Sequence, residues 1–216
     1  IAQSSHIAAP GSEACVPAEH SWQHSSSEVP EVLPNIPAGH FTHIYGPPLF
    51  HEPAAQLAAA IRDTGVPVIA RAVGACFTGA LEVALHCDFV YTTDTTKFGD
   101  THTKFGLRPT WGMSQTLSRA VGQRRARELS FTAKIFTGAQ AVEWGIANDS
   151  FETPEALDEA LAATCAQITA NSAEAVAAMK DLYRLAENED GIRASLKAET
   201  SSQYSITDTE ERLSAF

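Results

Sequence analysis

The chain has 216 residues, of which 44% are hydrophobic, and its formal net charge is −11 at pH 7. This length fits one domain with or without an appendage, and the acidic balance argues against duplex nucleic acid as a partner. No apolar run approaches the ~18 residues that a membrane span needs, so we expect no membrane partner either.

The first 37 residues differ in composition from everything that follows. They hold five prolines and the Ser/His-rich stretch "HSWQHSSSE", and their apolar residues follow neither the β-strand nor the α-helix period. We predict a loop or an extended appendage over residues 1–37.

From residue 53 onward, the pattern predicts short helices and strands in alternation. Apolar spacing and Gly or Pro at the ends indicate helices, and β-branched runs indicate strands. The predicted elements are a helix over 53–65, a strand over 66–74, a short helix over 79–88, strand character over 89–99, helices over 113–122 and 123–133 separated by Gly122, and a helix over 138–149 ending at Gly145.

The last third of the chain reads as helical. Two amphipathic helices are predicted over 153–171 and 172–190, with Thr153 and Ser172 as N-caps, and more helix follows. The whole pattern predicts an α/β protein with a core over residues 38–150 and a helical C-terminal region over 151–216.

The four cysteines indicate neither a metal site nor a disulfide framework. Cys15, Cys76, Cys87 and Cys165 form no CxxC pair and no metal-ligand spacing. Cys76 and Cys87 lie in apolar sequence, which favours buried, reduced thiols. We therefore expect no metal ion and a reducing, cytoplasmic location.

The stretch "FTGAL" (77–81) joins a predicted strand to a predicted helix through Gly79. The amide groups of such a turn and of the first helical turn lack partners, and the helix dipole adds positive charge there. The site would suit a carbonyl oxygen that becomes an oxyanion. A helix that packs closely on a strand also demands a small residue, so both readings stay open at this point.

Two polar residues stand in apolar surroundings close to this turn. Glu82 follows Gly79 by three residues among apolar neighbours, and a partly desolvated carboxyl group can exchange protons near neutral pH. His102 follows in "FGDTHTKFG". The simpler readings are a Glu stabilised by the helix dipole and an ordinary packed or surface histidine. The basic stretch 122–127, "GQRRAR", reads first as a solvated helix face.

Taken together, residues 67–149 resemble the crotonase, or enoyl-CoA hydratase/isomerase, superfamily. The register runs without gaps from 67 to 106. The residues that carry the resemblance are Pro67, Val68, Ile69, Ala70, Gly74, Gly79, Glu82, Cys87, Asp88, Phe98, Gly99, Gly106, Leu107, Val121, Gly122, Thr137, Gly138, Ala141, Trp144 and Gly145.

The resemblance implies a spiral of ββα turns followed by a C-terminal helical trimerisation region. It also implies an acyl-CoA substrate, a homotrimer or hexamer, and no separate cofactor, because coenzyme A is part of the substrate. Two departures stand out. Residues 1–37 show no pattern of the family's opening strands and long helix, so the first spiral turns are either rebuilt or lacking. Phe41 stands where the family usually has Asp.

The resemblance also assigns roles to individual residues. It places one of two oxyanion-binding amides on Gly79 and matches the other to "IPAGHF", where Ala38 and Gly39 precede His40 as the donor. Substrate contacts are implied for Thr78 and Trp111. Glu82 matches the first of the two catalytic glutamates of hydratases, and the second falls on His102, whose imidazole can also exchange protons.

The function predicted from these residues is that of an enoyl-CoA hydratase-like lyase, which adds water to a 2-enoyl-CoA thioester through a stabilised enolate. Glu82 would be the principal acid/base, and His102 would assist. The alternatives are enoyl-CoA isomerisation or other crotonase-type thioester chemistry, and a non-catalytic acyl-CoA-binding homologue.

Overall fold

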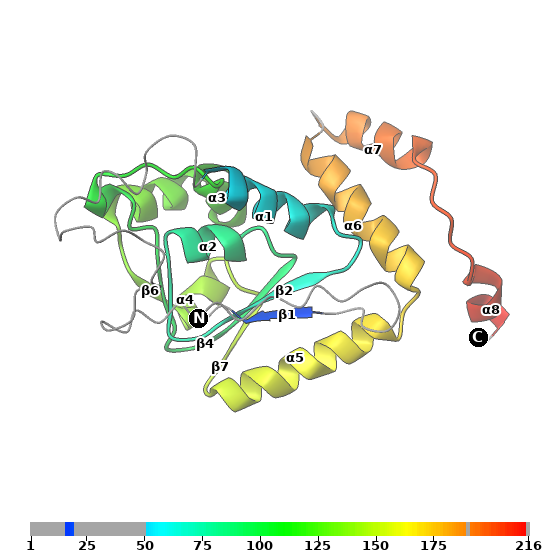
Figure 1. The fold of residues 1–216 in the computed structure, drawn as a ribbon, viewed down its shortest axis with the longest axis horizontal. Helices are drawn as coiled ribbons and strands as arrows, with labels where there is room; N and C mark the ends of the chain where they lie inside the picture. Colours follow the sequence, from blue (N-terminus) through cyan, green and yellow to red (C-terminus); the bar gives the residue numbers. More distant parts are fainter. Residues whose placement is uncertain (1–15, 20–50, 189–190, 215–216) are drawn as a thin grey trace.

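The computed structural model describes residues 16–19, 51–188 and 191–214, which form two small sheets with helices around them (Figure 1). The first sheet has four parallel strands in the order β1 (Val16–Glu19), β2 (Val68–Ala72), β4 (Phe89–Thr93) and β7 (Asp149–Phe151). The middle strands β2 and β4 carry fully buried side chains such as Ile69, as a sheet covered on both faces requires.

Strand β1 corrects the prediction of a loop or an extended appendage for residues 16–19, the part of the segment 1–37 that the structure describes. It pairs in parallel with β2, so that Val16 lies opposite Val68. A strand this short carries little pattern of its own, and it forms because β2 offers unpaired backbone groups along one edge. The pairing is therefore a tertiary effect that local periodicity does not report.

The second sheet contains β3 (Ala75–Phe77), β5 (Lys97–Gly99) and β6 (Phe136–Thr137). The run predicted as one strand over 89–99 is divided between the two sheets, because a turn closed by the Thr96 amide on the Thr93 carbonyl separates β4 from β5. Each β-β-helix unit thus gives one strand to each sheet. The predicted ββα spiral is confirmed in this alternation.

Four helices and a 3₁₀ turn belong to this core. They are α1 (His51–Asp63), α2 (Gly79–Ala84), η2 (Thr103–Phe105), α3 (Met113–Thr132) and α4 (Gly138–Glu143). The break predicted at Gly122 is confirmed, because this residue has φ 76° and ψ 156° inside α3. Only glycine adopts such a backbone conformation readily.

The helical C-terminal part comprises α5 (Pro154–Thr169), α6 (Ala173–Asn188), α7 (Ile192–Ser201) and α8 (Thr209–Ser214). Both predicted caps are confirmed: the Ala156 amide donates to the Thr153 hydroxyl, and the Ala175 amide donates to the Ser172 hydroxyl. Figure 1 shows α5 below the first sheet, on the side away from α2, while α7 and α8 extend away from the body. The boundaries at 37/38 and 150/151 stay predictions.

The core fills the space between α2, α3, α4 and the sheets. Phe98 stacks on Phe136 with ring centroids 5.6 Å apart, and Phe136 meets Trp144 at 5.2 Å. Leu81 and Met113 are fully buried in the same cluster. This packing holds the start of α3 against α2.

Lys180, whose side chain is 9% exposed, ties α6 to the core. The Lys180 ammonium donates to the Ile61 carbonyl, the Val66 carbonyl and the Asp88 carboxylate at 2.8–2.9 Å. Asp88 also accepts from the Val68 amide at 2.7 Å, so one carboxylate joins β2, the segment after α2, and α6. We refer to Lys180, Asp88 and the two carbonyl groups as the lysine clamp.

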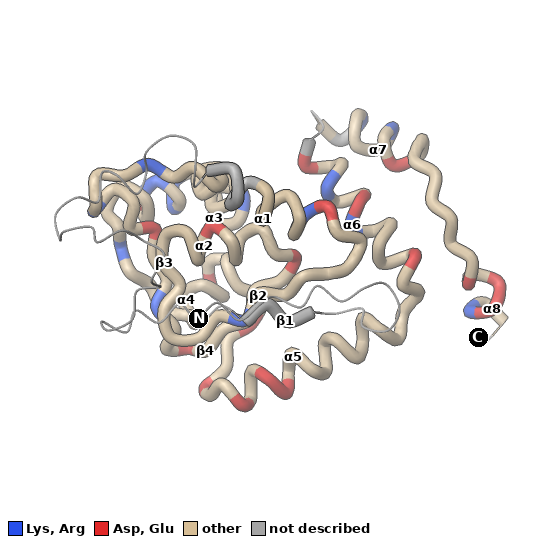
Figure 2. The backbone as a smooth tube through the Cα atoms, viewed as in Figure 1, with Lys and Arg blue, Asp and Glu red and all other residues tan. Residues whose placement is uncertain are grey.

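Charge is distributed unevenly over the surface. Figure 2 shows acidic residues, coloured red, along α5, where Glu155, Asp158 and Glu159 are exposed. The basic stretch 122–127 lies on α3 with its arginines exposed and Ala126 buried, as expected of a solvated helix face. Within the parts of the chain that the structure describes, no helix has the length and apolar character needed to cross a bilayer.

Candidate active site

The turn between β3 and α2 is a strained bend with a free amide at its end. Thr78 has φ 45°, which is uncommon for a β-branched residue, and its own amide donates to the Gly99 carbonyl at 3.0 Å. None of the residues that the structure describes accepts a hydrogen bond from the Gly79 amide, the first of α2. Strain of this kind costs about 1–3 kcal/mol and is often found at functional sites.

The Trp111 ring covers Gly79. A Cβ atom added to Gly79 would lie 2.6 Å from the Trp111 Cζ3 atom, so only glycine leaves room for the indole. The structure thus gives Gly79 a packing reason. The oxyanion reading of the "FTGAL" turn stays a prediction.

Glu82 is held inside the protein by the backbone that leads into α3. Its side chain is 2% exposed, and its Oε1 atom accepts from the Trp111 amide at 3.0 Å and the Met113 amide at 3.1 Å. The carboxylate therefore joins α2 to the start of α3. A simple surface cap of α2 would lie in solvent, and the burial excludes that reading.

His102 and Asp100 complete a buried cluster with Glu82. The His102 Nδ1–H donates to the Asp100 Oδ1 atom at 2.6 Å, and the same oxygen accepts from the His102 amide at 3.3 Å. On the other side of the ring, Nε2 lies 3.5 Å from the Glu82 Oε2 atom. All three side chains are no more than 3% exposed. We call these three residues the acid–imidazole cluster.

The charges of the cluster depend on one another. Burial lowers the pKa of His102, but hydrogen bonds and charge from Asp100 and Glu82 outweigh this effect and raise it to about 9. Burial alone would raise the pKa of Asp100, but hydrogen bonds from His102 and Ser130 and the imidazolium charge hold it below its usual value. Near neutral pH, His102 is therefore an imidazolium beside the Asp100 carboxylate.

His86 supports the cluster from the far end of α2. Its Nε2–H donates to the Trp111 carbonyl at 2.6 Å, and its Nδ1 atom is buried with no hydrogen-bond partner among the described residues. It thereby holds the peptide segment whose amides bind Glu82. No motif in the sequence singles out His86.

Most of the predicted site residues come together here. Glu82 and His102 are in contact, Gly79 lies one turn before Glu82, and Thr78 and Trp111 flank Gly79. Ala38, Gly39 and His40 lie outside the described residues. The sequence left Asp100 open as a backbone hydrogen-bond acceptor at the turn or as a substitute for the second glutamate, and the structure shows that it accepts from the His102 amide and also from the His102 ring. Sequence reasoning missed this bond to the ring and the binding of Glu82 by the Trp111 and Met113 amides, although the spacing "DTH" is a signal for a turn in which the Asp reaches the His.

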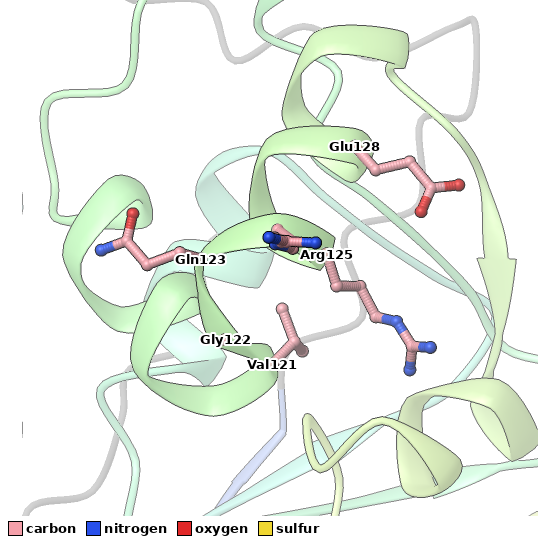
Figure 3. A pocket seen from close by; sticks show the side chains of 6 residues that line it. Val121, Gly122, Gln123, Arg125 and Glu128 are labelled. Atoms are coloured by element: carbon pink, nitrogen blue, oxygen red, sulfur yellow. The ribbon is translucent and has the colours of Figure 1, made fainter.

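Two hollows are described on the surface, and neither is lined by a residue of the acid–imidazole cluster or by Gly79. One, of about 540 Å³, lies beside the break in α3 and is lined by residues such as Gln123, Arg125 and Glu128 (Figure 3). The other, of about 600 Å³, lies by the lysine clamp, with His86 in its wall.

The comparisons with known proteins identify the family and the fold. The model of the family described as enoyl-CoA hydratase/isomerase matches residues 47–216. The chain belongs to this family. The family resemblance and the crotonase fold that the sequence predicted are thereby confirmed, whereas a trimerisation role for the C-terminal helices stays a prediction.

Curated relatives share part of the chain. The "Probable enoyl-CoA hydratase 1, peroxisomal" of Arabidopsis thaliana is 42% identical over 94 residues, which cover 44% of this chain and 36% of that protein. The "Probable enoyl-CoA hydratase" of Rhizobium meliloti is 36% identical over 97 residues, covering 45% and 38%. The chain thus spans less than half the length of these relatives.

Solved structures show the same architecture over a longer stretch. An enoyl-CoA hydratase from Bacillus anthracis has a TM-score of 0.68 at 25% identity, covering 77% of this chain and 65% of that one. A Thermobifida fusca protein in complex with acetoacetyl-CoA has a TM-score of 0.62 at 28% identity, covering 77% and 60%. These matches show the fold, and the bound acetoacetyl-CoA is a feature of the Thermobifida fusca protein.

Proposed function

We propose that this protein is a lyase that adds water to a 2-enoyl-CoA thioester. The observation that carries the proposal is the buried pair of Glu82 and His102, 3.5 Å apart, beside the Gly79 amide that begins α2. Proton exchange at a carbon atom next to a thioester requires a proton carrier and a donor for the enolate oxygen. The names of the relatives support the same reaction.

In the first step, the Glu82 carboxylate takes a proton from water while the water oxygen bonds to the β-carbon. The electron pair of the carbon–carbon double bond moves toward the thioester, whose oxygen becomes an enolate oxyanion. The Gly79 N–H donates to this oxygen, and His40 stays the predicted second donor. One well-aimed donor of this kind lowers the barrier by about 3 kcal/mol.

In the second step, the enolate collapses as its α-carbon takes a proton from the Glu82–His102 pair. The product is a 3-hydroxyacyl-CoA, and the enzyme regains its starting protonation. Coenzyme A leaves with the product, so the reaction consumes no separate cofactor.

The direct test is hydration of crotonyl-CoA and of a longer enoyl-CoA by the purified protein. Glu82→Gln keeps an oxygen for the Trp111 and Met113 amides but removes the base, so we expect kcat to fall about 1,000-fold. Glu128→Gln, at an exposed carboxylate, is the matched control and should retain full activity. A Glu82→Gln enzyme as active as wild type would contradict the proposal.

A second candidate is isomerisation of a 3-enoyl-CoA to a 2-enoyl-CoA. The observation in its favour is that Glu82 faces the imidazole of His102, where hydratases of the family carry a second glutamate. Isomerisation moves one proton between two carbon atoms, and this needs only one carboxylate. Mass spectrometry separates the two reactions, since hydration adds the mass of one water and isomerisation leaves the mass unchanged.

Binding of acyl-CoA without turnover of either substrate would support a non-catalytic acyl-CoA-binding homologue. Thioester hydrolysis, another reaction of the crotonase type, would release free coenzyme A and is detected in the same assay with a thiol reagent.

The proposal includes a homotrimer or hexamer. Its support is the C-terminal arm, in which α7 and α8 extend from the body and leave Leu196 52% and Leu213 70% exposed (Figure 1). Apolar side chains on an extended arm are typical of an interface. Light scattering on the eluted protein would give the mass of the assembly, and a monomer would contradict this part of the proposal.

A further inference from the structure

Asp100 holds His102 through two atoms at once. One carboxylate oxygen accepts both the ring Nδ1–H and the backbone amide of His102, so the ring cannot rotate without breaking the bond. Asp100 follows directly after β5, and its position is therefore set by the sheet. With Nδ1 committed to Asp100, the remaining ring nitrogen, Nε2, faces Glu82.

We propose that Asp100 is a positioning residue that directs His102 Nε2–H toward Glu82. His102 therefore delivers a proton in the reaction, whereas a neutral imidazole in the same position would accept one. This inference rests on the proposed function and deepens it, because it assigns opposite roles to the two partners of the pair. Glu82 takes the proton from water, and His102 gives a proton to the α-carbon.

The electrostatics around the ring favour the proton-donating role. Two carboxylates face the imidazole, Asp100 from the end of β5 and Glu82 from α2, while Ser130 of α3 donates to Asp100. These partners raise the pKa of His102 to about 9 against the effect of burial. An imidazolium at neutral pH cannot act as a base until it has released a proton.

The proton balance closes within the cluster. Water loses a proton to Glu82 as its oxygen bonds to the β-carbon, and the α-carbon takes the Nε2 proton of His102 as the enolate collapses. The proton on Glu82 then crosses the 3.5 Å gap to Nε2 and restores both residues. The negative charge of Asp100 stays in place throughout and stabilises the imidazolium.

Proton NMR correlated with ¹³C on the labelled histidine rings tests the positioning without any turnover. Among the eight histidines, the signal missing in His102→Gln identifies His102. We expect it to titrate near 9 in wild type and at least one pH unit lower in Asp100→Asn, whereas Asp149→Asn, at an exposed carboxylate, leaves it unmoved. A wild-type titration at or below 6.5 would overturn the proposal even if Asp100→Asn did not fold.

The pH dependence of hydration tests the chemical half of the proposal. With crotonyl-CoA, kcat should fall above about pH 9 in wild type, and Asp100→Asn should move this basic limb to lower pH, with kcat reduced about 100-fold and KM little changed. A basic limb that does not move would overturn the proton-donating role while leaving hydratase activity established. A wild-type protein inert toward crotonyl-CoA would instead defeat the proposed function, and the NMR titration would still decide what Asp100 does.

Discussion

Two charged clusters lie close to α2, and they are built on different principles. In the lysine clamp, one ammonium meets one carboxylate and two carbonyl oxygens, so every proton of the Lys180 ammonium has an acceptor within the protein. In the acid–imidazole cluster, two carboxylates share one imidazole, and the Glu82–His102 separation of 3.5 Å is longer than a strong charged hydrogen bond. In the lysine clamp every donor is paired, whereas in the acid–imidazole cluster a proton can still move between His102 and Glu82.

The comparison shows that the groups around a charged side chain decide whether it stabilises the fold or can exchange a proton. The clamp joins three segments and has no group left to exchange a proton. The cluster holds Glu82 with two amides on one oxygen and leaves the other oxygen facing an ionisable ring. We therefore expect substitutions in the clamp to affect stability and substitutions in the cluster to affect pH dependence and turnover.

Lys180→Met should have the largest effect on stability. The methionine fills similar space but leaves the Asp88 carboxylate and two carbonyl groups without their donor, so the free energy of unfolding should fall by about 3 kcal/mol in urea titrations. Lys134→Met, which removes an exposed pair with Glu128, is the control and should cost at most ~0.5 kcal/mol. Equal effects of the two would show that the clamp contributes no more than a surface pair.

Gly79→Ala, at the start of α2, should come next. The added methyl group meets the Trp111 ring, and overpacking of this kind costs about 2 kcal/mol. Chemical unfolding of Gly79→Ala, Trp111→Ala and the double variant forms a thermodynamic cycle. The double variant should be more stable than the sum of the single effects predicts, and strict additivity would mean that the ring does not meet residue 79 in solution.

The acid–imidazole cluster should make stability depend on alkaline pH. Because the folded-state pKa of His102, about 9, exceeds the ordinary 6.5, its contribution is complete below pH 6.5 and is lost as pH rises through 9. The slope for one proton is at most ~1.4 kcal/mol per pH unit. Unfolding free energies of wild type and His102→Gln at several pH values isolate this effect, and parallel curves would contradict it.

The smallest effect is expected at the ion pair between β2 and α5. Arg71 donates to Asp158 at 2.6 Å, but the Asp158 side chain is 54% exposed, so solvent screens the pair. Asp158→Asn should lower the free energy of unfolding by about 0.5 kcal/mol in low salt and by less in 1 M NaCl. A loss as large as that of Lys180→Met would contradict the expected difference between the lysine clamp and a solvent-screened pair.

Much of the local structure follows from residues close together in the chain. The apolar run that forms β2, the caps Thr153 and Ser172, and the break at Gly122 are each set by the side chain or backbone freedom of one short stretch. The same holds for the motif that marks the family, because Gly79 and Glu82 lie one helical turn apart. The sequence pattern could not show that β4 and β5 belong to different sheets. Only three residues separate the two strands, and so short a turn hardly changes the pattern of apolar and β-branched residues.

What the sequence alone determined is the family, the alternation of short strands and helices, and the two side chains, Glu82 and His102, that the proposed chemistry needs. Only the tertiary structure decided that Asp100 holds the imidazole, that the amides of Trp111 and Met113 hold the carboxylate, and that β1 extends the sheet. The physical reason is that residue type and helical period are local properties. The protonation of a buried ring depends instead on which distant groups the fold brings within a few ångströms of it.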